Sequence, residues 1–266
     1  DEDFVENYPP DKKGKAGKTT VTYRGQTGIQ QAVRLTPMVN TQDYVTIYNE
    51  AAVNDNKYLP AGLQRSLISA EDAARFSDIN YVDELLRTAP VNSHEFSVSG
   101  GSEKTNYLLS ASFYDQRGII KNTGYTRGTA RLDVTTEASP WLTVGISMLA
   151  GLSDNDIIGS SGDGYGGNGG SVVRYAFFRN PAIPIQFEDG TYVDRPAEYF
   201  GAQVFDSYLG DGYNPIGMAE YNDNNRKDDS YLGKAFFTAA ITDKLKFTTN
   251  LGMDYRNTTN RRFNPS

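Results

Sequence analysis

Large apolar and small polar residues alternate along the middle of the chain, most regularly between Trp141 and Leu152. One side of this segment carries Leu142, Val144, Ile146, Met148, Ala150 and Leu152, and the other carries Thr143, Gly145, Ser147 and Gly151. Successive side chains of a strand point to opposite faces, so the pattern predicts a strand with one apolar face. Because about 9–11 tilted residues cross a bilayer as a β-strand, its length suits a membrane-spanning strand as well as a soluble sandwich strand.

The same alternation predicts six further strands, at residues 19–29, 95–100, 104–115, 125–136, 229–242 and 244–256. In the segment 125–136, the apolar side carries Ala130, Leu132 and Val134, and the other side carries Arg127, Thr129, Arg131 and Asp133. Charged side chains are costly against lipid but stable in a water-filled lumen. We therefore expect Arg127, Arg131 and Asp133 to face a lumen or a plug, with a solvent-exposed face of a soluble sheet as the alternative.

Two insertions, at residues 30–92 and 153–229, interrupt the strands. The first contains a predicted helix over residues 41–53, capped by Asn40 or Thr41, and a second over residues 79–87, capped by Asp78. The other insertion contains a predicted helix over residues 171–180 that ends at Pro181. Long insertions between strands are usually functional, so we expect them to form outward-facing loops.

The second insertion is rich in aromatic residues, which suit both sugar rings and protein partners. The candidates for substrate or partner contact are Tyr165, Tyr175, Phe178, Tyr192, Tyr199, Phe200, Tyr208 and Tyr213. Packing of the insertion against itself would use the same residues. Asp154, Asp156 and Asp163 lack the loop spacing of an EF-hand, and we predict no metal site and no cofactor.

Composition narrows the classes of function. The net charge of −7 over 266 residues disfavours a nucleic-acid partner, and the absence of cysteine excludes disulfides. No apolar run reaches 18 residues, but barrel strands alternate and give only a weak hydropathy signal. The single histidine, His94, excludes a multi-histidine metal site. With no P-loop, no nucleophile elbow and no distinct carboxylate pair, we predict no enzyme.

Residues 99–134 also resemble the early barrel region of the SusC/RagA family of TonB-dependent outer-membrane transporters. The positions that carry this resemblance are Ser99, Gly100, Gly101, Tyr107, Ser110, Tyr114, Gly118, Tyr125 and Arg131. The upstream residues 85–98 and the later segments 178–185 and 189–193 fit the same family.

The resemblance implies a transmembrane antiparallel β-barrel of 22 strands, of which this chain supplies about seven. Residues 19–266 would be the N-terminal part of the barrel, with extracellular insertions at 30–92 and 153–229. Residues 1–18 would be an irregular segment, either a remnant of a plug domain or a junction with one.

The implied protein lies in the bacterial outer membrane, in contact with its lipid and with its loops on the cell surface. It would import oligosaccharides or peptides, powered by the TonB complex through a region outside this chain, with a SusD-like surface lipoprotein as partner. The alternatives are a soluble or surface-attached β-sandwich that binds glycans, and a glycoside hydrolase. Sandwich strands are commonly about 5–6 residues long, shorter than most of the strands predicted here.

Overall fold

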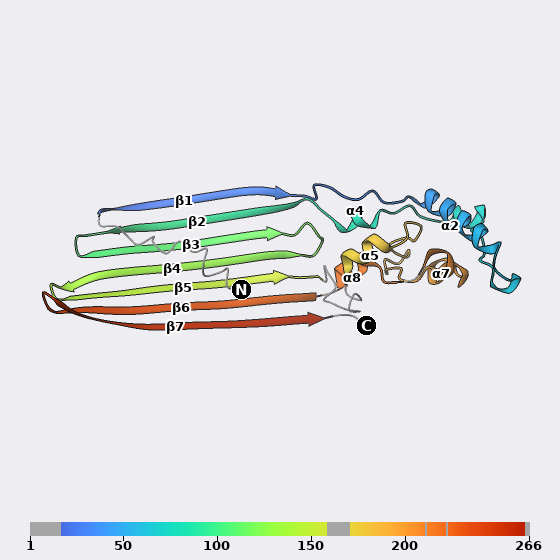
Figure 1. Cartoon of the computed structure of the whole chain (residues 1–266). Helices are drawn as coiled ribbons and strands as arrows, with labels where there is room; N and C mark the ends of the chain where they lie inside the picture. The colour runs from blue at the N-terminus through green and yellow to red at the C-terminus, as the bar shows by residue number, and fades with distance from the viewer. Residues whose placement is uncertain (1–16, 159–170, 211, 222, 264–266) are drawn as a thin grey trace.

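A computed structural model describes residues 17–158, 171–210, 212–221 and 223–263. Seven strands form one antiparallel sheet in which each strand pairs with the next along the chain (Figure 1). They are β1 (Gly17–Gln30), β2 (Ala89–Gly101), β3 (Thr105–Arg117), β4 (Gly124–Ser139), β5 (Leu142–Asp156), β6 (Asp223–Thr242) and β7 (Leu245–Phe263). The predicted all-β, antiparallel fold class is confirmed.

All seven predicted strands are present, but most are longer than the alternation indicates. The largest difference is in β2, predicted over residues 95–100 and found over 13 residues. Polar Asn92 and Ser93 interrupt the apolar pattern there, yet both pair with β1 and β3. Pro90, which lacks a backbone donor, pairs only with Ile29 of β1, because pairing with β3 starts at Val91. β5 and β6 likewise extend into the second insertion.

The register places the apolar residues of all seven strands on one face, since directly opposite residues share a face. One row across the sheet consists of Val21, Val98, Leu109, Leu132, Met148, Gly233 and Met253. The adjacent row on this face consists of Tyr23, Phe96, Ala111, Ala130, Ala150, Tyr231 and Tyr255. No other described element covers these rows, and Val21 and Met253 are 61% and 59% exposed. We call this surface the apolar face.

The opposite face of the sheet is mainly polar, and we call it the polar face. A representative row consists of Thr22, Ser97, Ser110, Arg131, Leu149, Leu232 and Asp254. Adjacent residues of one strand, such as Met148 and Leu149, therefore lie on opposite faces.

The two ends of the sheet differ in their connections. At one end, short turns join β2 to β3, β4 to β5 and β6 to β7. At the other end lie the connection 118–123 and the two long ones, which run from 31 to 88 and from 157 to 222. The helices gather beyond this second end (Figure 1). They are α2 (Thr41–Asn56), the 3-10 helix η1 (Ala61–Leu63), α3 (Ala70–Ala73), α4 (Tyr81–Leu85), α5 (Val172–Phe178), α6 (Pro196–Phe200), α7 (Val204–Leu209) and α8 (Pro215–Tyr221).

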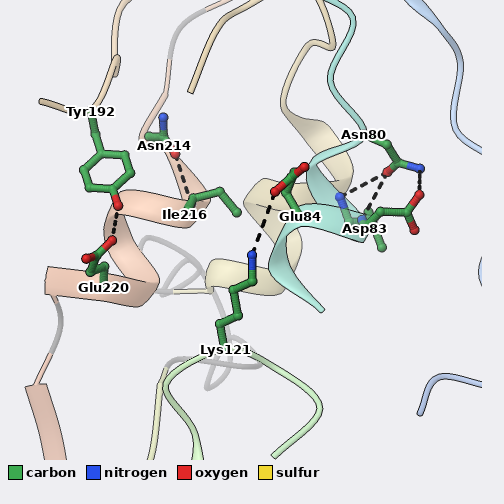
Figure 2. A network of polar contacts seen from close by, with 9 residues as sticks. Asn80, Asp83, Glu84, Lys121, Tyr192, Asn214, Ile216 and Glu220 are labelled. Carbon is green, nitrogen blue, oxygen red and sulfur yellow. Dashed lines mark hydrogen bonds and ion pairs between the residues drawn. The ribbon is translucent and has the colours of Figure 1, made fainter. Parts of the chain in front are cut away.

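Two of the three predicted helices begin as expected. The Asn40 side chain accepts a hydrogen bond from the Asp43 amide at 2.8 Å at the start of α2, and Ser171 caps α5 in the same way. The predicted cap of the other helix is wrong. Asn80, not Asp78, accepts hydrogen bonds from the first turn of α4 (Figure 2).

Asp78 instead stabilises the start of a different helix. Its carboxylate accepts a hydrogen bond from the backbone amide of Thr41 at 2.8 Å, and the Thr41 hydroxyl donates to the Ser77 carbonyl at 2.6 Å. The aspartate therefore acts on α2, 37 residues earlier, which local capping rules do not consider.

The described residues of the two long connections, 31–88 and 171–221, pack together into one helical unit that we call the cap. Its first core cluster consists of Ile68, Ala182, Ile183, Val193, Phe200, Phe205, Tyr208 and Leu209. The second joins Tyr81, Val82 and Leu85 to Ile158, Val172, Ala176 and Ala219. Each cluster takes residues from both connections, and the first connection contributes only Ile68 to the buried residues of the first cluster. None of the described helices is long and apolar enough to cross a membrane.

Candidate functional site

The first half of the cap consists of residues 31–88, and the second half consists of the described residues within 171–221. Hydrogen bonds from two tyrosines join these halves. The Tyr81 hydroxyl donates to the Ile183 carbonyl at 3.0 Å, and the Tyr44 hydroxyl donates to the Tyr208 carbonyl at 2.5 Å. Burial raises the pKa of both phenols, because it removes water that would stabilise the charged form. Both therefore remain neutral donors at physiological pH.

A buried arginine, Arg179, donates hydrogen bonds to several backbone carbonyls in the second half of the cap. Arg179 is 7% exposed, and its guanidinium donates to the backbone carbonyls of Val193, Asp194 and Gly212. It also lies 6.0 Å from the ring centroid of Tyr81. A single side chain thus provides a donor to three carbonyls, of which that of Val193 also accepts a hydrogen bond from Asn214 at 3.2 Å. We did not single out Arg179 from the sequence, although it lies in the segment 178–185 that carries the family resemblance.

Asn214 has a similar role at the start of α8. It is 1% exposed, and its side chain donates to the Ile185 carbonyl at 2.8 Å and accepts from the Ile216 amide at 3.0 Å (Figure 2). Its backbone amide donates to Asp194 at 2.7 Å. Asn214 therefore connects α8 to the segment 185–194, which also accepts hydrogen bonds from Arg179.

The side chain of Tyr192 meets α8 near the sheet. Its hydroxyl donates to the Glu220 carboxylate (Figure 2), and its ring packs edge-on against Tyr221 with 5.2 Å between centroids. Desolvation, with the nearby carboxylate adding to it, raises the pKa of Tyr192 to about 12. A Cβ atom on Gly217 would lie 2.8 Å from Cγ of Tyr192, so only glycine leaves room for this ring.

The connection 118–123 attaches the cap to the sheet. The Arg87 side chain donates to the carbonyls of Gly118 and Thr123 at 3.0 and 3.1 Å. Lys121 lies 3.8 Å from Glu84 of α4 (Figure 2), and Asn122 donates to the Ala219 carbonyl of α8 at 3.0 Å. Both halves of the cap are thus fixed to the β3–β4 hairpin.

The aromatic candidates from the sequence divide into two groups. Phe200 and Tyr208, 5% and 6% exposed, belong to the first core cluster and pack the cap against itself. Phe178, Tyr213 and Tyr199 lie on the surface, with exposures of 75%, 56% and 39%, and Tyr175 and Tyr192 are half-buried. Tyr165 lies outside the described residues.

The charged candidates Arg127, Arg131 and Asp133 lie together on the polar face. Arg131 pairs with Asp133, which also accepts a hydrogen bond from Ser147 of β5. Two further pairs join residues two apart on one strand, Arg226 with Asp228 on β6 and Asp254 with Arg256 on β7. The strands β4, β6 and β7 thus each carry an Arg–Asp pair on the polar face. The sequence shows the three pairs, and the register shows that they share a face.

Within the described part of the chain, no group of three or more histidine and carboxylate side chains is arranged to hold a metal ion. The cap and the polar face instead offer aromatic surface, hydroxyl groups and paired charges. These groups suit reversible contacts with a polar ligand or a protein.

The fold defines the chain as a section of a large antiparallel β-sheet with one apolar face that no described element covers, one polar face and a cap at one end. This is the architecture of a partial outer-membrane barrel. No protein-family model matches the chain.

Curated relatives match almost the whole chain. It is 24% identical over 255 residues to "TonB-dependent receptor P3" of Formosa agariphila, a match that covers 96% of this chain and 23% of the relative. It is 25% identical over 124 residues to "TonB-dependent receptor SusC" of Bacteroides thetaiotaomicron, covering 46% of this chain and 11% of that protein. The chain therefore spans no more than about a quarter of the length of these relatives. The SusC/RagA resemblance predicted from residues 99–134 is confirmed.

Solved structures agree on the fold. The RagAB peptide importer in its "open-open" state aligns with a TM-score of 0.66 and 19% identity, over 93% of this chain and 29% of that chain. The structure of the RagAB peptide transporter aligns with a TM-score of 0.63 and 17% identity over the same shares. At these identities the likeness concerns the fold alone, and it confirms the partial barrel.

Proposed function

We propose that this chain is part of an outer-membrane, TonB-dependent transporter that imports nutrients and has no enzymatic activity. The observation that carries the proposal is the apolar face, which runs across all seven strands and which none of the described elements covers. On β5 it extends from Leu142 to Leu152, eleven residues, which matches a tilted transmembrane strand. Lipid is the cover that such a surface requires.

In this proposal the polar face lines the interior of the barrel. Its paired charges would be costly against lipid and are stable toward water or a plug. Arg127, Arg131 and Asp133 are accordingly assigned to the lumen or to a contact with a plug. Residues 19–266 are assigned to the N-terminal part of the barrel. Gly17 and Lys18, predicted to be irregular, begin β1, and the rest of the predicted plug segment lies outside the described residues.

The cap is assigned to the cell surface, because bacterial barrels have short periplasmic turns and long extracellular loops. Its exposed aromatics, Phe178, Tyr199 and Tyr213, would contact a SusD-like lipoprotein or the substrate. The relatives named SusC and RagAB support such a partner and a cargo that is an oligosaccharide or a peptide. Energy would come from the TonB complex, through a region outside this chain.

The test uses the complete polypeptide in outer membranes. A protein that resists sodium carbonate extraction and migrates differently on a gel after heating is expected, since intact barrels unfold only when heated. Release by carbonate as a stable soluble monomer would overturn the proposal and favour a surface-attached β-sandwich that binds glycans.

The partner assignment is tested by substitutions on the cap surface. Removing residues 160–225 would remove most of the joint core, so point variants are more informative. Phe178→Ser combined with Tyr213→Ser is expected to reduce co-purification of the lipoprotein or uptake. Tyr58→Ser, in the other half of the cap and 89% exposed, is the matched control. Equal capture and uptake by both variants would contradict a role for the two aromatics.

A further inference from the structure

A polar cavity of about 620 Å³ lies where the cap meets the ends of the strands. Five carboxylates and two guanidinium groups contribute to its lining, together with amide and hydroxyl side chains. Its volume falls within the range of small-ligand sites, about 300–1,000 Å³. The transport proposal assigns no role to this cavity.

Several strand residues that line the cavity continue the alternation of the apolar face toward the cap. Asp154 is the next residue on that side after Leu152, and Asp115 is the next after Phe113. One row further along, the residues are Arg117, Gly124 and Asp156. The cavity also has Gln116, Tyr125 and Asn224 in its lining, which occupy positions of the polar face, so it lies at the ends of the strands and borders both faces. On one side it is continuous with the end of the apolar face.

The carboxylates of the cavity are already oriented by neighbouring donors. Thr126 donates to Asp115 at 3.2 Å, Lys227 lies 3.1 Å from Asp154, and Asn225 donates to Asp156 at 2.8 Å. On the cap side, the Tyr192 hydroxyl donates a hydrogen bond to the Glu220 carboxylate. Each of these groups keeps further acceptor capacity, so the cavity presents several fixed acceptors together with the donor Arg117.

The charges of these groups disfavour an anionic ligand and favour a neutral ligand that carries hydroxyl groups. An excess of carboxylates repels phosphate, and because each carboxylate has a donor partner, the cavity does not require a cation. A neutral sugar fits, because its hydroxyl groups donate to fixed carboxylates and accept from a guanidinium. Gly124 leaves open space at the floor of the cavity, where a Cβ would lie 3.6 Å from the Gln116 carbonyl and 4.0 Å from Asp156, both ordinary contacts.

We propose that this cavity binds the neutral saccharide head of an outer-leaflet glycolipid whose acyl chains lie on the apolar face. The choice of a lipid-borne sugar rests on the proposed function, since it follows from the continuity between the apolar face and the cavity. A free oligosaccharide would use the same chemistry, and the test separates the two sources.

The test places the complete polypeptide in nanodiscs that contain phosphatidylcholine with either digalactosyldiacylglycerol or phosphatidylglycerol. Bound lipid is counted by native mass spectrometry. We expect the galactolipid to be retained in preference to phosphatidylglycerol, and Gly124→Leu, which fills the cavity, to weaken its retention about tenfold or more. The control is Gly28→Leu on the polar face of β1, where a Cβ meets nothing within 4 Å and where the proposal places no part of the lipid. We expect this control to retain the galactolipid as the unsubstituted protein does.

Three outcomes would overturn the inference. Equal retention by the two leucine variants would show that the cavity does not hold the lipid, and preference for phosphatidylglycerol would refute a neutral ligand. Displacement by free digalactose at the affinity of the galactolipid would refute the lipid source. The heat-dependent shift on a gel is measured on the same samples, so failure of the barrel to insert is distinguished from failure of the cavity to bind.

Discussion

The phenol of Tyr81 donates a hydrogen bond to the carbonyl of Ile183, 102 residues away along the chain, at 3.0 Å. This contact joins the two long connections, because Tyr81 belongs to the second core cluster of the cap and Ile183 to the first. It explains why the cap is one unit although four strands separate its halves in the sequence.

Replacing Tyr81 by phenylalanine keeps the ring but removes this donor, so the carbonyls of Ile183 and Pro184 lose a partner. We expect a local destabilisation of the cap by about 1–3 kcal/mol, the usual cost of an unsatisfied buried polar group. Hydrogen exchange of residues 172–185 in the complete protein measures it. The heat-dependent gel shift should not change, and unchanged exchange would show that the hydrogen bond contributes nothing.

Replacing Arg179 by methionine is expected to destabilise the cap by about 1–3 kcal/mol, because the carbonyls of Asp194 and Gly212 lose this donor and that of Val193 keeps only Asn214. Limited proteolysis between residues 186 and 214 should become faster. The control is Arg174→Met on α5, an exposed arginine that packs over Phe178 at 5.4 Å, where we expect almost no change. Similar proteolysis of the two variants would contradict the organising role of Arg179.

The pH dependence of the cap should reflect Tyr192. Its pKa is raised to about 12 in the folded protein, against about 10 for an unfolded tyrosine. The folded state therefore holds its proton more tightly, and its stabilising contribution is complete below pH 10 and is lost as the pH rises toward 12. Tyrosinate absorbance should show one late-titrating group that is absent in Tyr192→Phe. A wild-type titration with no difference from the variant would exclude it.

Substituting Gly217 by alanine should displace the Tyr192 ring, since the new methyl group would lie 2.8 Å from Cγ. Overpacking of this kind costs about 1–3 kcal/mol. We also expect the late tyrosine titration to move toward the ordinary value, because the contact with Glu220 is broken. Retention of the late titration in Gly217→Ala would mean that the ring has room to move without losing its partner.

Two adjacent positions on β5 test the assignment of the faces. An arginine at Met148 would lie against lipid and is expected to cost about 2–4 kcal/mol near the bilayer centre. An arginine at Leu149 would lie on the polar face and should be tolerated. The yield of heat-modifiable protein in the outer membrane is the measurement. Equal yields of Met148→Arg and Leu149→Arg would refute the assignment.

The sheet was largely predictable because strand pairing follows alternation, which is local. The same reasoning failed where a partner lies far away in the sequence. Asp78 looks like the cap of the helix that follows it, yet it binds Thr41. Phe200 and Tyr208 resemble surface aromatics in a glycine-rich insertion, but residues from both halves of the cap bury them. The role of Arg179 depends on carbonyls whose positions no local pattern specifies.

The shared core of the cap also sets an order of events during synthesis. Each β-hairpin closes through contacts between neighbouring residues, whereas the cap cannot form until residues 31–88 meet residues 171–221, after β2 to β5 have been made. Contacts of such long sequence separation form late. The first connection, with exposed Val33 and Leu63 even in the finished fold, must therefore wait without its core. During this interval the chain is most exposed to aggregation.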